Sequence, residues 1–112
     1  MSLFKNSKIF ISDSKKHGHG VFANQKLFAG ELIEETPFIE ITCVVDANIM
    51  KYSMCDPKGQ ILFIPLGSCT VLNSSKESNV EYLLDSEKRK VIFKAKCDIE
   101  SGDELFLSYG FN

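Results

Sequence analysis

The 112-residue sequence contains no tryptophan, only two histidines and three prolines, and no large excess of either charge. Its 13 Lys and Arg against 15 Asp and Glu give a net charge of −2, whereas domains that bind nucleic acid usually carry a basic surplus. No apolar run approaches the roughly 20 residues that a membrane-spanning helix requires, and residues 1–6 lack the apolar core of a secretory signal. We therefore expect neither direct nucleic-acid binding nor a membrane partner.

Cysteine and histidine are too scattered to suggest a metal site. The cysteines stand at positions 43, 55, 69 and 97, and the histidines, His17 and His19, lie far upstream of them. Zinc sites typically pair their ligands at gaps of two to four residues. We expect no metal and four reduced, mostly buried thiols, with a disulfide or a metal site as the less favoured alternatives.

Short β-branched and aromatic runs dominate the chain. The clearest period-two pattern lies late in the sequence and places on one face Val91, Phe93, Ala95, Cys97 and Ile99. Residues 80–84 alternate in the same way, and the polar residues 86–89 join the two runs as a hairpin. Further strands are expected at 8–11, 31–35, 38–41 with a second run to 45, 61–64 and 105–107; turns are expected at 12–16, 28–30, 56–59 and 100–103.

Residues 47–54 form the one stretch with helical character. Because strands recur at short spacing and 12 aromatic residues (nine Phe, three Tyr) can fill a core, we predict a mainly β fold of several short sheets in a single domain, residues 1–112.

Residues 18–23, GHGVFA, formally fit the G-x-G-x-x-G/A dinucleotide fingerprint. That fingerprint needs a helix after the glycines and a doubly wound sheet, but the residues from Val21 onward show no helical periodicity. What survives is a tight turn where the backbone approaches another group closely.

Two later segments carry site-like residues. Asn73 and Asn79 flank a polar loop, which by itself is more often a surface turn. Residues 99–110 end in Tyr109-Gly110, and a tyrosine in such a place more often packs at a sheet edge than takes part in catalysis.

Together, in this order, the three segments resemble the SET domain, the fold of protein lysine methyltransferases that use S-adenosyl-L-methionine (AdoMet). The family opens with a Gly-x-Gly turn, an apolar-aromatic-Ala strand and a Gly-Glu-Leu-Ile step, which residues 18–23 and 30–33 reproduce. Its last motif, Asp-Ile-x-x-Gly-Glu-Glu-Leu-x-x-x-Tyr-Gly, is closely matched by residues 98–110. Its middle motif, Asn-His-Ser-x-x-Pro-Asn, corresponds to residues 73–79, with Ser74 in place of His and Ser78 in place of Pro.

The resemblance implies roles for individual residues. The catalytic residue is Tyr109, whose hydroxyl lies near the methyl group and the lysine amine. The implied cofactor-binding residues are Gly18, His19, Gly20, Asn73 and Ser74. The implied wall of the lysine channel consists of Tyr82, Tyr52 and Phe111. Acidic residues that would receive a basic peptide, or simply form a solvated face, are Glu34, Glu35, Glu77 and Glu81.

The resemblance also bears on architecture and partners. It implies a C-terminal pseudoknot in which residues 73–79 meet residues 108–111. The match covers residues 8–110, without the zinc-binding pre-SET and post-SET segments of larger members, as in minimal viral and bacterial SET proteins. The substrate is then a lysine-containing protein or peptide, a homodimer could cover the open channel edge, and the location is the cytoplasm, or a host nucleus for a virus or intracellular bacterium.

Two other functions remain open. One is a catalytically inactive SET-like module that binds peptide or cofactor. The other is an unrelated small β interaction domain.

Overall fold

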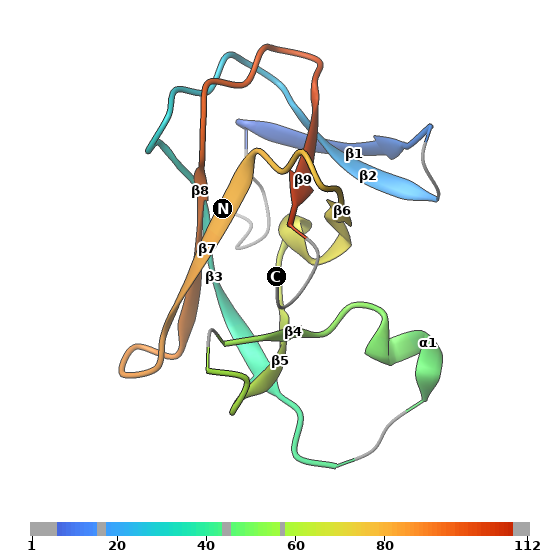
Figure 1. Cartoon of the computed structure of the whole chain (residues 1–112), viewed down its shortest axis with the longest axis vertical. Helices are drawn as coiled ribbons and strands as arrows, with labels where there is room; N and C mark the ends of the chain where they lie inside the picture. The colour runs from blue at the N-terminus through green and yellow to red at the C-terminus, as the bar shows by residue number, and fades with distance from the viewer. Residues whose placement is uncertain (1–6, 16–17, 44–45, 57, 109–112) are drawn as a thin grey trace.

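The computed structural model describes residues 7–15, 18–43, 46–56 and 58–108, and it is mainly β (Figure 1). In the described residues the strands are β1 (Ile9–Asp13), β2 (His19–Ala23), β3 (Leu32–Glu40), β4 (Met54–Cys55), β5 (Leu62–Pro65), β6 (Asn73–Ser74), β7 (Val80–Asp85), β8 (Lys90–Ala95) and β9 (Glu104–Leu107). They form one sheet in the order β1-β2-β9-β6 and a second in the order β4-β5-β3-β8-β7. The predicted fold class of several short sheets is confirmed.

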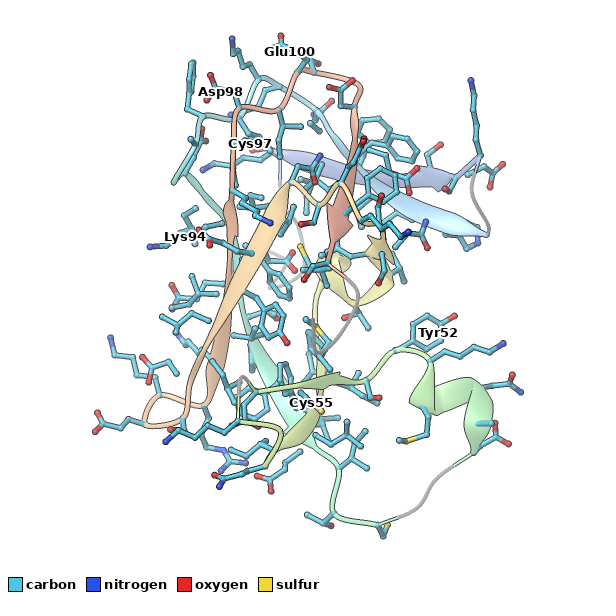
Figure 2. The ribbon with its side chains drawn as sticks, in the orientation of Figure 1. Tyr52, Cys55, Lys94, Cys97, Asp98 and Glu100 are labelled. Atoms are coloured by element: carbon cyan, nitrogen blue, oxygen red, sulfur yellow. The ribbon has the colours of Figure 1, made fainter. Side chains whose placement is uncertain are left out.

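The predicted hairpin at residues 86–89 is confirmed, since β7 and β8 pair in antiparallel register with Asp85 opposite Lys90. On the β8 side that faces the core, Val91, Phe93 and Ala95 are buried. Cys97, predicted to share that face, is exposed because β8 ends at Ala95 and the chain turns away (Figure 2). Period-two alternation holds only while the strand continues.

A β-bulge changes which side chains of β3 face inward. The register against β8 shifts between Leu32 and Glu34, so the consecutive side chains of Ile33 and Glu34 are both buried. The bulge therefore carries a carboxylate into the interior beside the core.

The core draws side chains from both sheets. Its largest members without solvent exposure are Phe63, Phe93, Leu27, Ile99 and Leu105. The half-buried ring of Tyr82 packs between Phe63 and Phe93, with centroids 6.3 and 6.2 Å away. Burial of side chains this large contributes about 1.5–3 kcal/mol each, so the core holds the two sheets at a fixed separation.

The predicted helix at 47–54 is wrong in its second half. Helix α1 covers Ala47–Met50 only, because the backbone N–H and the hydroxyl of Ser53 both donate to the Met50 carbonyl, at 3.1 and 2.7 Å. Met54 then enters β4 and pairs with Phe63 on β5. Residues 44 and 45, part of a predicted strand, lie outside the described residues, and no described helix has the length and apolarity of a membrane span.

The expectation of mostly buried thiols is also wrong. Cys69 is buried and Cys55 half-buried, whereas Cys43 and Cys97 are exposed in loops that follow β3 and β8; all four are free.

Candidate functional site

The C-terminal strand β9 lies between β2 and β6 (Figure 1). It pairs antiparallel with β2, Leu105 opposite Val21, and parallel with β6, Phe106 opposite Asn73. Residues 73–79, predicted to meet residues 108–111, bond to residues 104–107 of the adjoining strand, and Ser108 lines a cavity together with Ser74. Tyr109 and Phe111 lie outside the described residues, so their predicted roles stay predictions.

The two asparagines that flank the loop of residues 73–79 both contact β9, although the middle of the loop is exposed. Asn79 extends the sheet: its Nδ2 donates to the Glu104 carbonyl at 3.0 Å, and its Oδ1 accepts from the Phe106 N–H at 2.7 Å. Asn73 is only 8% exposed. Both asparagines therefore hold β9 in place, and neither side chain serves merely to solvate a turn.

The turn predicted at residues 18–20 is right only for Gly18, because His19 and Gly20 already belong to β2 and pair with Asp13 and Ser12. Gly18 has φ +57°, with open space where a side chain would lie, and its carbonyl accepts from the Ser14 N–H at 2.8 Å. At Gly20 a Cβ would collide with the Glu104 carboxylate and lie 3.2 Å from Asn73 Nδ2. Residues 19–23 form strand β2 and no helix, so the dinucleotide fingerprint is excluded.

A side-chain hydrogen bond links the two predicted cofactor-binding segments across β9. Asn73 Nδ2 donates to the His19 carbonyl at 3.1 Å, which joins β6 to the start of β2. The His19 side chain itself is exposed, 3.6 Å from the Asp13 carboxylate, so His19 contributes backbone to this place.

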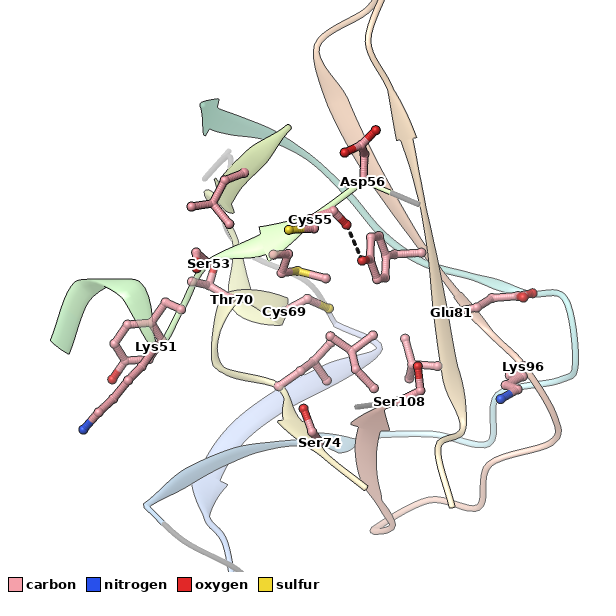
Figure 3. A pocket seen from close by; sticks show the side chains of 17 residues that line it. Lys51, Ser53, Cys55, Asp56, Cys69, Thr70, Ser74, Glu81, Lys96 and Ser108 are labelled. Atoms are coloured by element: carbon pink, nitrogen blue, oxygen red, sulfur yellow. Dashed lines mark hydrogen bonds between the residues drawn. The ribbon is translucent and has the colours of Figure 1, made fainter. Parts of the chain in front are cut away.

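A cavity of about 660 Å³ opens beside β6 (Figure 3). The described residues that line it come from the segment between α1 and β5, from the 3-10 turn η1 (Ser68–Val71), from β6 and β7, and from the end of β9. It brings together Tyr52, Ser74 and Tyr82, and Ser108 lies at the same wall. The predicted channel residues Tyr82 and Tyr52 thus share one cavity with the predicted cofactor residue Ser74.

Tyr82 spans part of this cavity. Its hydroxyl donates a hydrogen bond to the Cys55 carbonyl, drawn as a dashed line in Figure 3. Burial of the ring raises the pKa of Tyr82 above its ordinary value of 10.0, with smaller contributions from Cys55 and Asp56. Tyr82 therefore stays a neutral hydrogen-bond donor, whereas Tyr52 is 48% exposed at the rim.

The predicted acidic surface is wrong for Glu34. This carboxylate is buried and accepts hydrogen bonds from the N–H groups of Ser68 and Cys69, at 3.3 and 3.0 Å. Burial, reinforced by Glu34, raises the pKa of the Cys69 thiol well above 9.0. Glu34 thus fixes η1 against β3. Glu35, Glu77 and Glu81 are exposed; Glu35 pairs with Lys90 at 3.2 Å, and Glu81 lines the cavity.

The role of Glu104 could not be predicted from the sequence. Its carboxylate accepts hydrogen bonds from Ser14 Oγ at 2.9 Å and Asn73 Nδ2 at 2.8 Å, next to Gly20. The available signal was its position inside the last family motif. Spacing alone could not show this contact, because Ser14 lies 90 residues away in sequence.

The resemblance implies that Asn73 helps to hold AdoMet, and the hydrogen bonds of its side-chain amide bear on that expectation. Asn73 Nδ2 donates both of its hydrogens within the site, whereas Asn73 Oδ1 accepts no hydrogen bond from a described residue. An amide oxygen is an acceptor for an ammonium group.

Metal binding and self-association stay predictions. Within the described residues, no three His, Cys, Asp or Glu side chains gather as a metal site. Metal analysis of protein purified without a histidine tag tests the expected absence of zinc, and sedimentation tests the expected dimer.

The family model described as SET domain matches residues 18–110. This match covers most of the chain, which therefore belongs to the SET domain family. Comparison with curated protein sequences gives no significant match.

Solved SET-domain structures share this fold. A Plasmodium falciparum protein described as a candidate histone methyltransferase superimposes with TM-score 0.77 at 27% identity, covering 96% of this chain and 97% of that one. The Neurospora SET domain protein DIM-5, a histone lysine methyltransferase, gives 0.67 at 19%, over 90% and 51%. The Chaetomium thermophilum polycomb repressive complex 2 bound to S-adenosylmethionine gives 0.68 at 18%, over 95% and 15%. The last two likenesses establish the fold.

Proposed function

We propose that the protein is an AdoMet-dependent protein lysine N-methyltransferase that transfers a methyl group to a lysine side-chain amine. One observation carries the proposal: residues 18–20 and Asn73 are hydrogen-bonded together, and the neighbouring residue of β6, Ser74, lines a cavity with Tyr82. The proposed cofactor site and the proposed lysine site would therefore adjoin each other at β6. Membership of the SET family and the likeness to histone methyltransferases support this reading.

Bound AdoMet supplies an electrophilic methyl group on a sulfonium. Displacement at that carbon requires the amine, the methyl carbon and the leaving sulfur to lie in line, so the protein's task is alignment. Asn73 Oδ1 and the backbone of residues 18–20 would hold the charged tail of the cofactor. The cavity beside Ser74 would direct the lysine side chain from the opposite side.

The attacking lysine must be neutral. The cavity wall combines apolar side chains such as Leu72 and Val80 with the carboxylates of Asp56 and Glu81; only where the amine is buried against the apolar part would its charged form be disfavoured and its pKa lowered.

Tyr82 and Tyr109 take different parts in this proposal. Tyr82, whose ring is fixed by Phe63, Phe93 and its bond to Cys55, limits how many methyl groups fit beside the amine. Tyr109 follows Ser108, which lines the cavity, and its hydroxyl would orient the amine and the methyl group in the transition state.

The test is radiolabelled methyl transfer from AdoMet across a panel of histones, ribosomal proteins and other lysine-containing proteins, beside calorimetric binding of S-adenosylhomocysteine. Transfer that is lost when the target lysine is replaced by arginine supports the proposal. Binding without transfer to any member of the panel would support a cofactor-binding module instead. Absence of both contradicts the proposed function.

A further inference from the structure

Glu104 links three segments of the proposed cofactor site. It lies at the start of β9; its Oε1 accepts from Ser14 Oγ, just before the glycine turn, at 2.9 Å, and its Oε2 accepts from Asn73 Nδ2 on β6 at 2.8 Å. One side chain thus bridges the β1–β2 connection, β6 and β9.

These contacts determine which way the Asn73 amide points. Asn73 Nδ2 donates to the His19 carbonyl and to the Glu104 carboxylate, which uses both of its hydrogens. If the amide were reversed, Oδ1 would face the His19 carbonyl oxygen and the Glu104 carboxylate, which are both acceptors. This arrangement is unfavourable because Asn73 is only 8% exposed. Oδ1 is therefore the atom left free for a ligand.

Glu104 also packs against the start of β2. Its carboxylate occupies the space that a side chain at position 20 would need. The Glu104 carboxylate therefore packs directly against the backbone at Gly20, beside the Asn73 amide.

We propose that Glu104 is a positioning residue of the cofactor site: it presents Asn73 Oδ1 as an acceptor for the ligand's ammonium group. The inference rests on the proposed function, because that function supplies the ligand. Its specific consequence is selective recognition. Loss of the Glu104 acceptor weakens the binding of ligands that carry the amino group and leaves the binding of ligands without it nearly unchanged.

The experiment measures calorimetric affinities for two probes, S-adenosylhomocysteine and its analogue without the α-amino group. Glu104→Met removes both acceptor oxygens at similar length, and Glu104→Gln keeps one oxygen for Asn73. Glu87→Met, in the exposed hairpin after β7, is the matched control. We expect Glu104→Met to weaken S-adenosylhomocysteine about tenfold or more, with less than about threefold change for the analogue. Glu104→Gln and Glu87→Met should stay within about threefold of wild type for both probes.

A readout without ligand accompanies the titrations. The side-chain amide protons of Asn73, followed by NMR, should shift and exchange faster with solvent in Glu104→Met than in Glu104→Gln. If Glu104→Met lowers the affinities for both probes equally, or lowers neither, the positioning role is overturned while the proposed function stands. Failure of the wild-type protein to bind either probe would overturn both.

Discussion

The Tyr82 hydroxyl donates a hydrogen bond to the Cys55 carbonyl across the cavity (Figure 3). Tyr82 lies on β7 and Cys55 on β4, which are the two edge strands of the same sheet. The sheet is therefore curved so strongly that a single side chain from one edge reaches the backbone of the other. The cavity that we assign to the lysine substrate lies beside this bond.

Tyr82→Phe should lower the free energy of unfolding by about 1 kcal/mol, because it deletes this hydrogen bond and keeps the ring in the core. Urea unfolding measures the loss. Tyr52→Phe, at an exposed rim position, is the control and should change stability by less than about 0.5 kcal/mol. Equal effects of the two substitutions would mean that the bond between the edge strands contributes little.

Glu34→Ala should be far more destabilising than Glu35→Ala. The first leaves the N–H groups of Ser68 and Cys69 without their acceptor, at a cost of about 2–3 kcal/mol. The second removes an exposed ion pair with Lys90, worth about 0–1 kcal/mol. Thermal unfolding of the two variants measures the difference, and the prediction fails if Glu35→Ala is the less stable variant.

Gly20→Ala should disturb the cofactor place more than Gly18→Ala. A Cβ at position 20 meets the Glu104 carboxylate and Asn73, whereas one at position 18 meets only open space and carries the strain of φ +57°, about 1–2 kcal/mol. We expect S-adenosylhomocysteine binding to fall about tenfold or more in Gly20→Ala. The collision should also lower the free energy of unfolding of Gly20→Ala. Adding Glu104→Ala removes the collision and should recover part of that free energy, whereas a loss caused by backbone strain at position 20 would not be recovered.

Tyr109→Phe should lower the rate of methyl transfer by roughly 10²–10³, or about 2.7–4 kcal/mol, with little effect on fold or cofactor affinity. Asn73→Ala should instead weaken cofactor binding first, because it removes the acceptor and the contacts to His19 and Glu104. Transfer rates at saturating AdoMet, beside calorimetric affinities, separate the two effects. A Tyr109 that only packs at a sheet edge would give equal rates in wild type and Tyr109→Phe.

Local patterns predicted much of the fold. The alternation in residues 80–84 and 91–95 and the polar residues 86–89 define the β7–β8 hairpin without reference to any distant residue. Turns at Gly30, Gly59 and Gly102 follow from glycine at positive φ. The family motifs located the cofactor segments, because their residue types and order are properties of the sequence itself.

Features that depend on distant partners escaped prediction. In the sequence, Glu34 is one acidic residue among several. The bulge against β8 turns its side chain inward, where the carboxylate accepts hydrogen bonds from backbone N–H groups 34 and 35 residues away in sequence. Cys97 continues an apolar alternation in the sequence, yet the strand has already ended. In both places, strand register and length decided the exposure of the side chain.

The sequence by itself determined the mainly β class, the hairpin and the family, because alternation, turn residues and motif order act over short stretches of chain. Only the tertiary structure decided that Glu104, Asn73 and Gly20 form one cluster and that the Tyr82 hydroxyl donates a hydrogen bond to the Cys55 carbonyl. The reason is physical: these groups come from strands far apart in sequence, and only insertion of β9 between β2 and β6, together with the curvature of the second sheet, brings them within hydrogen-bonding distance.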